Sequence, residues 1–344
     1  MTIDRTALEE TARAMVAKGR GILAADESNA TMTKRLEAVG VESTPESRRA
    51  FRGLMFTAEG AADHISGVIM YDETIRQATD GGTPFPEFLA GVGILSGIKV
   101  DTGAKPLAGF LGEIVTEGLD GLRDRLSEYR ELGARFAKWR AVITTCDGRP
   151  TRGCIAANAH ALARYAGLCL QAGIVPIVEP EVLMHGDHSI DRSEEVTAAV
   201  LRAVFEQLAE QRVLLEGVVL KPNMLLSGYD CPEQAGVEEV AERTLACLRR
   251  VVPAAVPGIA FLSGGQSDER AAAHLNAMNR IGGVPWELTF SYGRALVAAP
   301  LKAWAADTST PARAQTAFLR RARCNSAARM GVYAESMELA ELVA

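Results

Sequence analysis

The hydrophobic positions of the chain fall into short runs rich in β-branched residues, and each run is followed by a polar or glycine-containing stretch and then an amphipathic one. Continuous apolar runs of this length are typical of strands buried on both faces. We predict eight such strands, at 21–28, 64–71, 93–101, 134–143, 173–182, 216–224, 258–265 and 287–296. The intervening segments predict helices, among them 117–132, 158–172, 192–211 and 233–251.

Strands that alternate with helices indicate an α/β fold in which right-handed crossovers join parallel strands. Eight units favour a closed (β/α)8 TIM barrel, formed by residues 1–344 as a single domain. Additional helices are expected at 4–18 and 311–329, and 335–344 would be a short C-terminal tail. The basic run at 319–329 suits either a partner-binding face or a solvated helix face, and we favour the second. No strand–helix junction carries a nucleotide-binding glycine motif.

Charged residues interrupt the predicted strands toward their C-terminal ends, where barrel enzymes place their catalytic groups. These residues are Asp26, Lys99, Lys138, Arg140, Glu179, Glu181 and Lys221. Any one of them alone would be an ordinary loop-edge charge, but together they indicate a polar site because buried charges must be paired or used. Side chains alternate along a strand, so Lys138 and Arg140 share one face, and so do Glu179 and Glu181.

Lys221 follows the most apolar run, in LEGVVLKPNM at 215–224. Burial and neighbouring cations both disfavour a charged amine, and we expect Lys138 to face Lys221 across the barrel mouth. Lys221 is therefore the best candidate for a Schiff-base amine. Formation and cleavage of an iminium also need proton transfer, for which Glu179, Glu181 and Asp26 are available.

Two groups of residues are suited to bind anions. After the seventh and eighth predicted strands, glycine-containing loops resemble the phosphate loops of barrel enzymes, with Ser263, Gly264, Gly265, Ser291, Gly293 and Arg294 as the candidate ligands. A second cationic group comprises Ser28, Thr31, Lys34, Arg35, Lys99 and Arg140. Each glycine loop alone could be a simple turn, but two anion sites beside one reactive lysine indicate a sugar bisphosphate.

Composition narrows the range of partners. The formal net charge is −6, so we expect binding neither to nucleic acid nor to an anionic membrane surface. The six cysteines are scattered, which is typical of reduced thiols in a cytoplasmic protein. No signal peptide or membrane-spanning segment is evident.

The motifs GRGILAADES, GIKVD, FAKWR, PIVEPE, LEGVVLKPNM, FLSGGQS and LTFSYGRAL occur in this order along nearly the whole chain. In this respect the sequence resembles class I fructose-bisphosphate aldolases, which form a Schiff base and need no metal or other cofactor. The resemblance implies a (β/α)8 barrel, reversible cleavage of fructose 1,6-bisphosphate to dihydroxyacetone phosphate and glyceraldehyde 3-phosphate, and a homotetramer.

The resemblance also implies roles for individual residues. Lys221 would form the Schiff base, Glu179 with Glu181 beside it would act as acid and base, and Asp26 would assist C–C cleavage. Lys138 and Arg140 would stabilise charge and bind substrate. The serine, glycine and arginine residues of the two glycine loops would hold one phosphate. Ser28, Arg35 and Lys99 would surround the other, with Thr31 where many relatives carry serine.

The C-terminus departs from the pattern of vertebrate members, which end in a tyrosine that takes part in proton transfer on the enamine. This chain ends MELAELVA, and its last tyrosine is Tyr333. We therefore expect that step to be absent or done by another group.

Three alternatives stay open. A metal-dependent aldolase could use His185 and His188 of the HGDH motif. Transaldolase and deoxyribose-phosphate aldolase share the lysine chemistry but need only one phosphate site. A non-catalytic scaffold is the third, although every motif residue is present.

Overall fold

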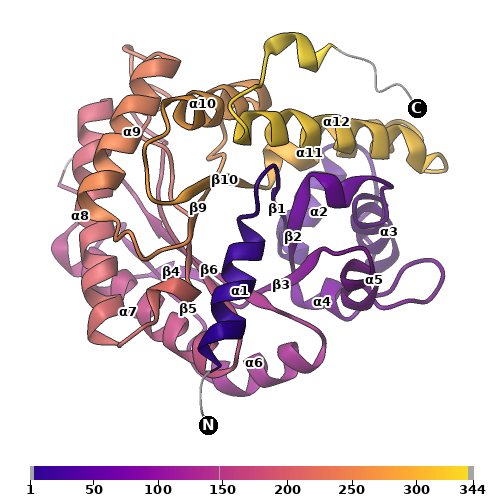
Figure 1. Cartoon of the computed structure of the whole chain (residues 1–344), viewed down its shortest axis with the longest axis horizontal. Helices are drawn as coiled ribbons and strands as arrows, with labels where there is room; N and C mark the ends of the chain where they lie inside the picture. Colours follow the sequence, from indigo (N-terminus) through magenta and orange to yellow (C-terminus); the bar gives the residue numbers. More distant parts are fainter. Residues whose placement is uncertain (1–3, 147, 340–344) are drawn as a thin grey trace.

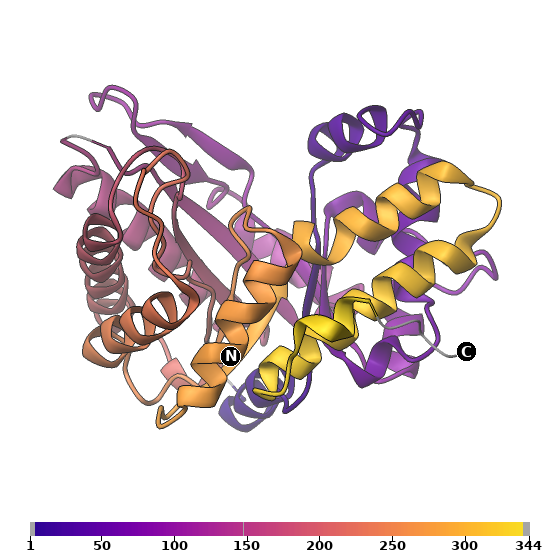
Figure 2. The same cartoon turned by 90° about the horizontal axis from the view of Figure 1, so that it is seen from above.

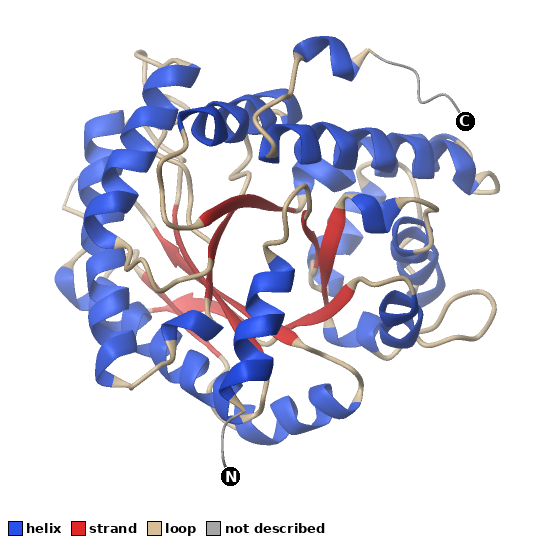
Figure 3. Cartoon of the chain, in the orientation of Figure 1, coloured by secondary structure: helices blue, strands red, loops and turns tan. Residues whose placement is uncertain are grey.

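The computed structural model describes residues 4–146 and 148–339, and eight parallel strands within them close into a barrel surrounded by helices (Figures 1 and 3). The strands pair in the order β1-β10-β9-β8-β7-β6-β3-β2. They are β1 Gly21–Ala25, β2 Ile65–Met70, β3 Leu95–Lys99, β6 Phe136–Ile143, β7 Val175–Val182, β8 Val219–Leu220, β9 Gly258–Phe261 and β10 Glu287–Tyr292. Each predicted strand is present, so the expected barrel is confirmed.

The strand that precedes Lys221 is much shorter than expected. A turn of 3₁₀ helix, η2 Leu215–Gly217, comes before β8, and Pro222 cannot donate the next backbone hydrogen bond. The Lys221 amide still donates to the Val178 carbonyl at 2.8 Å. The sheet therefore holds the lysine backbone although the strand itself ends at Leu220.

Helices connect the strands and cover the outside of the barrel. They are α1 Arg5–Met15, α2 Asn29–Glu37, α3 Pro45–Phe56, α4 Asp72–Ile75, α5 Phe85–Gly91, α6 Leu122–Glu131, α7 Arg152–Gln171, α8 Ile190–Glu210, α9 Val237–Val251, α10 Asp268–Ile281, α11 Arg294–Ala306 and α12 Pro311–Arg329, with short turns η1 Ala61–Asp63 and η3 Glu335–Glu338. In Figure 1, α1 lies across one end of the barrel. Figure 2 shows α11 and α12 packed side by side on the outside.

One predicted helix starts later than expected. Residues 117–121 are not helical, because an antiparallel hairpin of β4 Gly103–Pro106 and β5 Ile114–Glu117 comes first. Gly118 and Gly121 then take φ values of +127° and +65°, which separate the hairpin from α6. The predicted helix at 233–251 similarly begins only at Val237.

The basic run at 319–329 is solvated only in part, because Arg323 is exposed and Arg320 is half-buried whereas Arg321 and Arg329 are buried. Arg321 and Arg329 are 4% and 5% exposed. Arg321 pairs with Glu338 and Arg329 with Glu287. These two arginines are buried beside acidic partners from η3 and β10, which the periodicity of one helix does not show.

Aromatic rings fill the N-terminal half of the barrel where the strands carry glycine. A Cβ on Gly97 would lie 2.2 Å from the Phe136 ring, and one on Gly21 would lie 2.6 Å from the Phe290 ring. The opposite half of the barrel contains charged side chains instead, so an apolar layer lies beneath the polar site. In the part of the chain that the structure describes, no helix is long and apolar enough to cross a membrane.

Candidate active site

A cavity of about 690 Å³ opens at the C-terminal ends of the barrel strands. The residues predicted for the site all line it except Lys34 and Gly265, and Gly265 lines a smaller cavity next to it. The alternation rule is confirmed as well, because Lys138 and Arg140 face the cavity while the ring of Trp139 packs against Tyr165 of α7 at 5.6 Å. Lys34 of the expected cationic group is exposed and does not line the cavity.

Four charged groups form a continuous line across the cavity floor. Lys221 Nζ lies 3.2 Å from Glu179 Oε1, and Lys138 Nζ lies 3.3 Å from Glu179 Oε2 and 2.6 Å from Asp26 Oδ2. The side chains of Lys138, Lys221 and Glu179 are 4–5% exposed, and that of Asp26 is 11% exposed. The carboxylate of Glu179 thus lies between the two lysines that we expected to face each other.

These contacts fix the charge of three of the groups. Burial alone would raise the pKa of Asp26, but the charges of Lys138 and Lys221 outweigh it and lower that pKa to about 2. The pKa of Glu179 is lowered too, because Lys138, Lys221 and Arg140 outweigh its burial. Burial disfavours the Lys138 ammonium, yet Asp26 and Glu179 raise its pKa. At neutral pH the floor therefore holds two carboxylates and a permanently charged Lys138.

Glu179 has free hydrogen-bonding capacity. Within the described residues, its Oε2 is buried and accepts no hydrogen bond, because Lys138 Nζ is close but poorly aligned. A buried carboxylate oxygen without a hydrogen bond is uncommon and is suited to receive a proton from a bound molecule. Glu179 can therefore exchange a proton beside Lys221.

A second layer of ion pairs supports the rim. Arg140 pairs with Glu181, which raises the pKa of Arg140 despite its burial. Lys99 Nζ lies 2.5 Å from Asp101 Oδ1, and Asp101 Oδ2 accepts a hydrogen bond from the Arg140 amide at 3.3 Å. Sequence reasoning missed Asp101, which stands two residues after Lys99, at the end of the predicted strand 93–101 and just beyond β3.

One end of the cavity is formed by the loops after β9 and β10. Gly264 and Gly265 take φ values of +57° and +87°, and α11 begins at Arg294 directly after Gly293. The Ser291 hydroxyl is buried and makes no hydrogen bond within the described residues. Helix N-termini carry free amides and a partial positive charge, so this end is suited to hold a phosphate.

The other end lies at the start of α2. Ser28 caps this helix, accepting from the Thr31 amide at 3.3 Å, and the two hydroxyl oxygens are 3.1 Å apart. Arg35 pairs with Glu27, which sequence reasoning did not assign to the site. Lys99 contributes the remaining cation. The structure thus brings both predicted anion-binding groups to opposite ends of one cavity.

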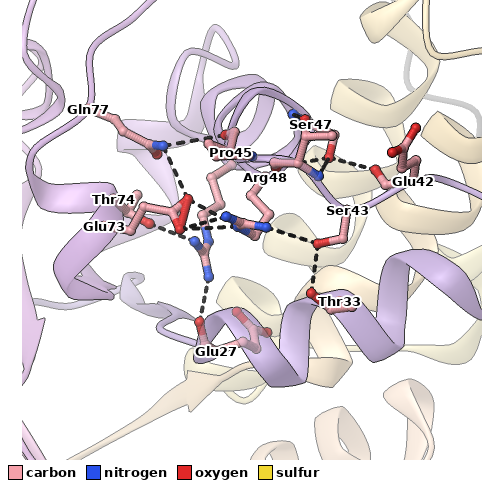
Figure 4. Close-up of polar contacts among 12 residues, drawn as sticks. Glu27, Thr33, Glu42, Ser43, Pro45, Ser47, Arg48, Glu73, Thr74 and Gln77 are labelled. Atoms are coloured by element: carbon pink, nitrogen blue, oxygen red, sulfur yellow. Dashed lines mark hydrogen bonds and ion pairs between the residues drawn. The ribbon is translucent and has the colours of Figure 1, made fainter.

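A polar network connects α2, α3 and α4 at this second end (Figure 4). Arg48 of α3 binds Glu73 of α4 through Nε and Nη2 at 2.9–3.1 Å. Its Nη1 donates to Ser43 Oγ at 3.0 Å, and that hydroxyl lies 2.8 Å from Thr33 Oγ1 of α2. The network therefore joins α3 and α4 to α2, the helix that carries Thr31 and Arg35 of the cavity lining.

Two other sequence features lie outside the cavity lining. His185 and His188 belong to no group of three or more possible metal ligands among the described residues. Tyr333 donates to Glu338 Oε1 at 2.9 Å and does not line the cavity. Residues 340–344 of the tail lie outside the described residues.

Comparisons with known proteins agree with one another. A family model described as "Fructose-bisphosphate aldolase class-I" matches residues 7–342. A "Probable fructose-bisphosphate aldolase class 1" of Xanthomonas campestris is 58% identical, covering 94% of this chain and 97% of that protein. The "Fructose-bisphosphate aldolase, muscle type" of Lethenteron camtschaticum is 51% identical over 95% of this chain and 90% of its own. The fructose-bisphosphate aldolase of Plasmodium falciparum, solved in complex with TRAP and a small-molecule inhibitor, superposes with a TM-score of 0.94 at 46% identity, covering 96% of this chain and 95% of that one.

Proposed function

Because the chain belongs to the class I fructose-bisphosphate aldolase family, we propose that Lys221 is its Schiff-base lysine and that the groups around it divide the steps of the reaction. The family is glycolytic and metal-independent, and it cleaves a sugar bisphosphate through a lysine imine. One observation carries the assignment to Lys221: its amine lies 3.2 Å from an ionised Glu179, on the floor of a cavity with an anion site at each end.

The imine forms first. Glu179 accepts a proton from the Lys221 ammonium, and the neutral amine attacks C2 of the open-chain ketose to give a carbinolamine. Glu179 then returns the proton to the departing hydroxyl, and water leaves as the C=N bond forms. This sequence needs a carboxylate that is ionised in the free enzyme and has an oxygen without a hydrogen bond, as Glu179 has.

Cleavage of the C3–C4 bond follows. Asp26, ionised because its pKa is about 2, accepts the proton of the C4 hydroxyl. The electron pair of the C3–C4 bond flows into the iminium as an enamine, and glyceraldehyde 3-phosphate departs. Lys138 lies 2.6 Å from Asp26 and stabilises the negative charge that develops at the C4 oxygen. Protonation at C3 and hydrolysis of the imine then release dihydroxyacetone phosphate.

The two phosphates take opposite ends of the cavity. C1 is bonded to C2, which the imine holds at Lys221 directly after β8, and β8 pairs with β9. We therefore assign the 1-phosphate to the loops after β9 and β10, which contain Ser263, Gly264, Gly265, Ser291, Gly293 and Arg294. The 6-phosphate takes the end formed by Ser28, Thr31, Arg35 and Lys99.

The quaternary structure, domain organisation and location are further parts of the proposal. We expect a homotetramer in the cytoplasm, in which each chain folds as a single barrel domain. Free cysteines at all six positions agree with a reducing compartment. Light scattering after size exclusion measures the oligomer, and one cooperative unfolding transition would support the single domain.

Borohydride trapping tests the Schiff base. Reduction in the presence of dihydroxyacetone phosphate should add the reduced ketose to Lys221 and abolish activity. Lys221→Met, which keeps the length of the side chain but has no amine, should neither trap substrate nor turn over. Lys302→Met, on the exposed side of α11, is the matched control and should retain both. Inactivation by EDTA with no effect of borohydride would sink the proposal.

A further inference from the structure

The loop that follows Lys221 is fastened to the loop that follows β7. The Gly228 amide donates to His188 O at 2.8 Å, Tyr229 to Met184 O at 3.0 Å and Asp230 to Gly186 O at 2.9 Å. The two loops pass so closely that a Cβ on Gly228 would lie 2.2 Å from the Gly186 carbonyl oxygen. Backbone carbonyls in and next to the HGDH motif at 185–188 therefore fix the position of Tyr229.

The side chain of Tyr229 contacts both the loop after β7 and the glycine loop after β9. Its ring packs edge-on against His185, with centroids 5.5 Å apart and an interplanar angle of 81°. Its hydroxyl donates to the Gly264 carbonyl. Met184 packs against the same turn, since a Cβ on Gly264 would overlap its terminal methyl at 1.5 Å. The turn is thus contacted by two side chains, and the Gln266 amide closes it by donating to the Ser263 carbonyl at 3.1 Å.

Tyr229 also lies beside the cation of that phosphate site. A Cβ on Gly265 would be 2.6 Å from an Arg294 guanidinium nitrogen and 2.7 Å from the Tyr229 hydroxyl, so both groups approach the same face of Gly265. Burial is the main reason that the pKa of Tyr229 is raised above its ordinary value, so the phenol stays protonated and able to donate at neutral pH. No described residue other than Tyr229 donates a side-chain hydrogen bond to Gly264 O.

The backbone hydrogen bond between Gln266 and Ser263 closes the turn but does not fix its central peptide unit, because turn types that differ in the orientation of that unit share this bond. Two consecutive glycines with positive φ have no side chain to restrict rotation of the peptide unit between them. In a trans peptide the carbonyl and the following amide point in opposite directions. A hydroxyl that fixes the Gly264 carbonyl therefore also fixes the direction of the Gly265 amide.

We propose that Tyr229 is a positioning residue for the 1-phosphate, because its hydroxyl holds the Gly264–Gly265 peptide with the amide turned toward the anion. This inference rests on the proposed function, since it takes the phosphate of a ketose phosphate as the ligand. Tyr229 acts through the backbone of the turn and not on the reacting carbons. Its contribution is therefore confined to substrates that carry the 1-phosphate.

The test compares two ketones that form the same imine. Dihydroxyacetone phosphate carries the phosphate and dihydroxyacetone lacks it, and borohydride trapping gives a half-saturating concentration for each. In Tyr229→Phe, loss of one neutral hydrogen bond should raise the value for dihydroxyacetone phosphate about three- to tenfold. The value for dihydroxyacetone should stay unchanged.

Tyr129→Phe is the matched control, because it removes a phenol hydroxyl that contacts Asp72 at 2.9 Å, away from the cavity lining. It should leave both ketones unaffected. Tyr229→Phe values equal to wild type for both ketones would overturn the inference, and so would an equal rise for both. If the wild-type protein trapped neither ketone, the proposed function itself would fail, and the inference with it.

Discussion

Arg52 offers the sharpest test of how the scaffold positions the catalytic groups. It is only 1% exposed, and its two terminal nitrogens donate to Thr74 Oγ1 at 2.7 Å and to the Glu27 carbonyl at 2.6 Å. Glu27 and Thr74 belong to the network of Figure 4. Since Glu27 follows Asp26 directly, the guanidinium ties α3 and α4 to the backbone of the carboxylate that we propose assists C–C cleavage.

We expect Arg52→Met to lower both stability and turnover. Methionine keeps much of the apolar stem but removes both hydrogen bonds, so the half-buried Glu27 carbonyl loses this donor. Hydrogen bonds that involve a charged group contribute about 1.5–3 kcal/mol each. Burial lowers the pKa of Arg52, so the removal of a poorly solvated charge offsets part of that loss. The free energy of unfolding should therefore fall by about 2–4 kcal/mol.

The effect on turnover follows from geometry. A displacement of a catalytic group by about 1 Å can lower a rate by about a hundredfold. Release of Glu27 frees Asp26 to move by part of that distance, so kcat should fall roughly ten- to a hundredfold. Imine formation at Lys221 should change little, because Arg52 contacts neither Lys221 nor Glu179.

Two measurements separate these effects. Denaturant unfolding gives the loss of stability, and single-turnover cleavage of fructose 1,6-bisphosphate gives the rate of the C–C step in folded protein. Arg49→Met is the matched control, since Arg49 lies on the same helix but pairs with Asp80, whose side chain is 92% exposed. Such a surface pair contributes about 0–1 kcal/mol. A folded Arg52→Met enzyme that cleaves substrate at the wild-type rate would refute the positioning role.

Two further predictions test the site. Folding lowers the pKa of Asp26 from 3.8 to about 2, so its ionised carboxylate contributes about 2 kcal/mol of stability above about pH 4, which is lost as pH falls through about 2. In acid unfolding titrations, the stability advantage of wild type over Asp26→Asn should shrink by that amount, and a constant difference would contradict the prediction. Gly264→Ala places a methyl against Met184 at a φ of +57°, whereas the methyl of Gly282→Ala, at a similar φ of +59°, has no atom nearer than 3.7 Å. Both substitutions should lower the melting temperature, but only Gly264→Ala should raise KM for the bisphosphate.

The barrel could be predicted because its strands are continuous apolar runs, whose order alone favours the closed fold. The β4–β5 hairpin was missed because its four-residue strands show no hydrophobic alternation. The burial of two arginines in the basic run of α12 was missed for a related reason. Arg321 and Arg329 find their acidic partners in η3 and β10, and a pattern confined to one helix does not contain that information.

The sequence predicted those parts of the candidate site that depend on the alternation of side chains along a strand. The period of two places Lys138 with Arg140 and Glu179 with Glu181, whatever the rest of the chain does. Tyr229 could not be found in this way, because its position depends on backbone hydrogen bonds between two irregular loops. Its only sequence signal was the HGDH motif, whose histidines were considered as metal ligands and not as part of a loop that accepts backbone hydrogen bonds.

The closed order of strands explains why so many charges are tolerated at the cavity floor. In the eight-membered ring, β1 and β7 stand opposite each other, and β6 is next to β7. Lys138 of β6 crosses the interior to reach Asp26 beyond β1 while also contacting Glu179 of β7. Each buried charge in this line therefore touches an opposite one, as low-dielectric burial requires. The same line places a carboxylate on each side of Lys138, as the proposed division of roles requires, with Glu179 beside the imine and Asp26 beside the C–C bond.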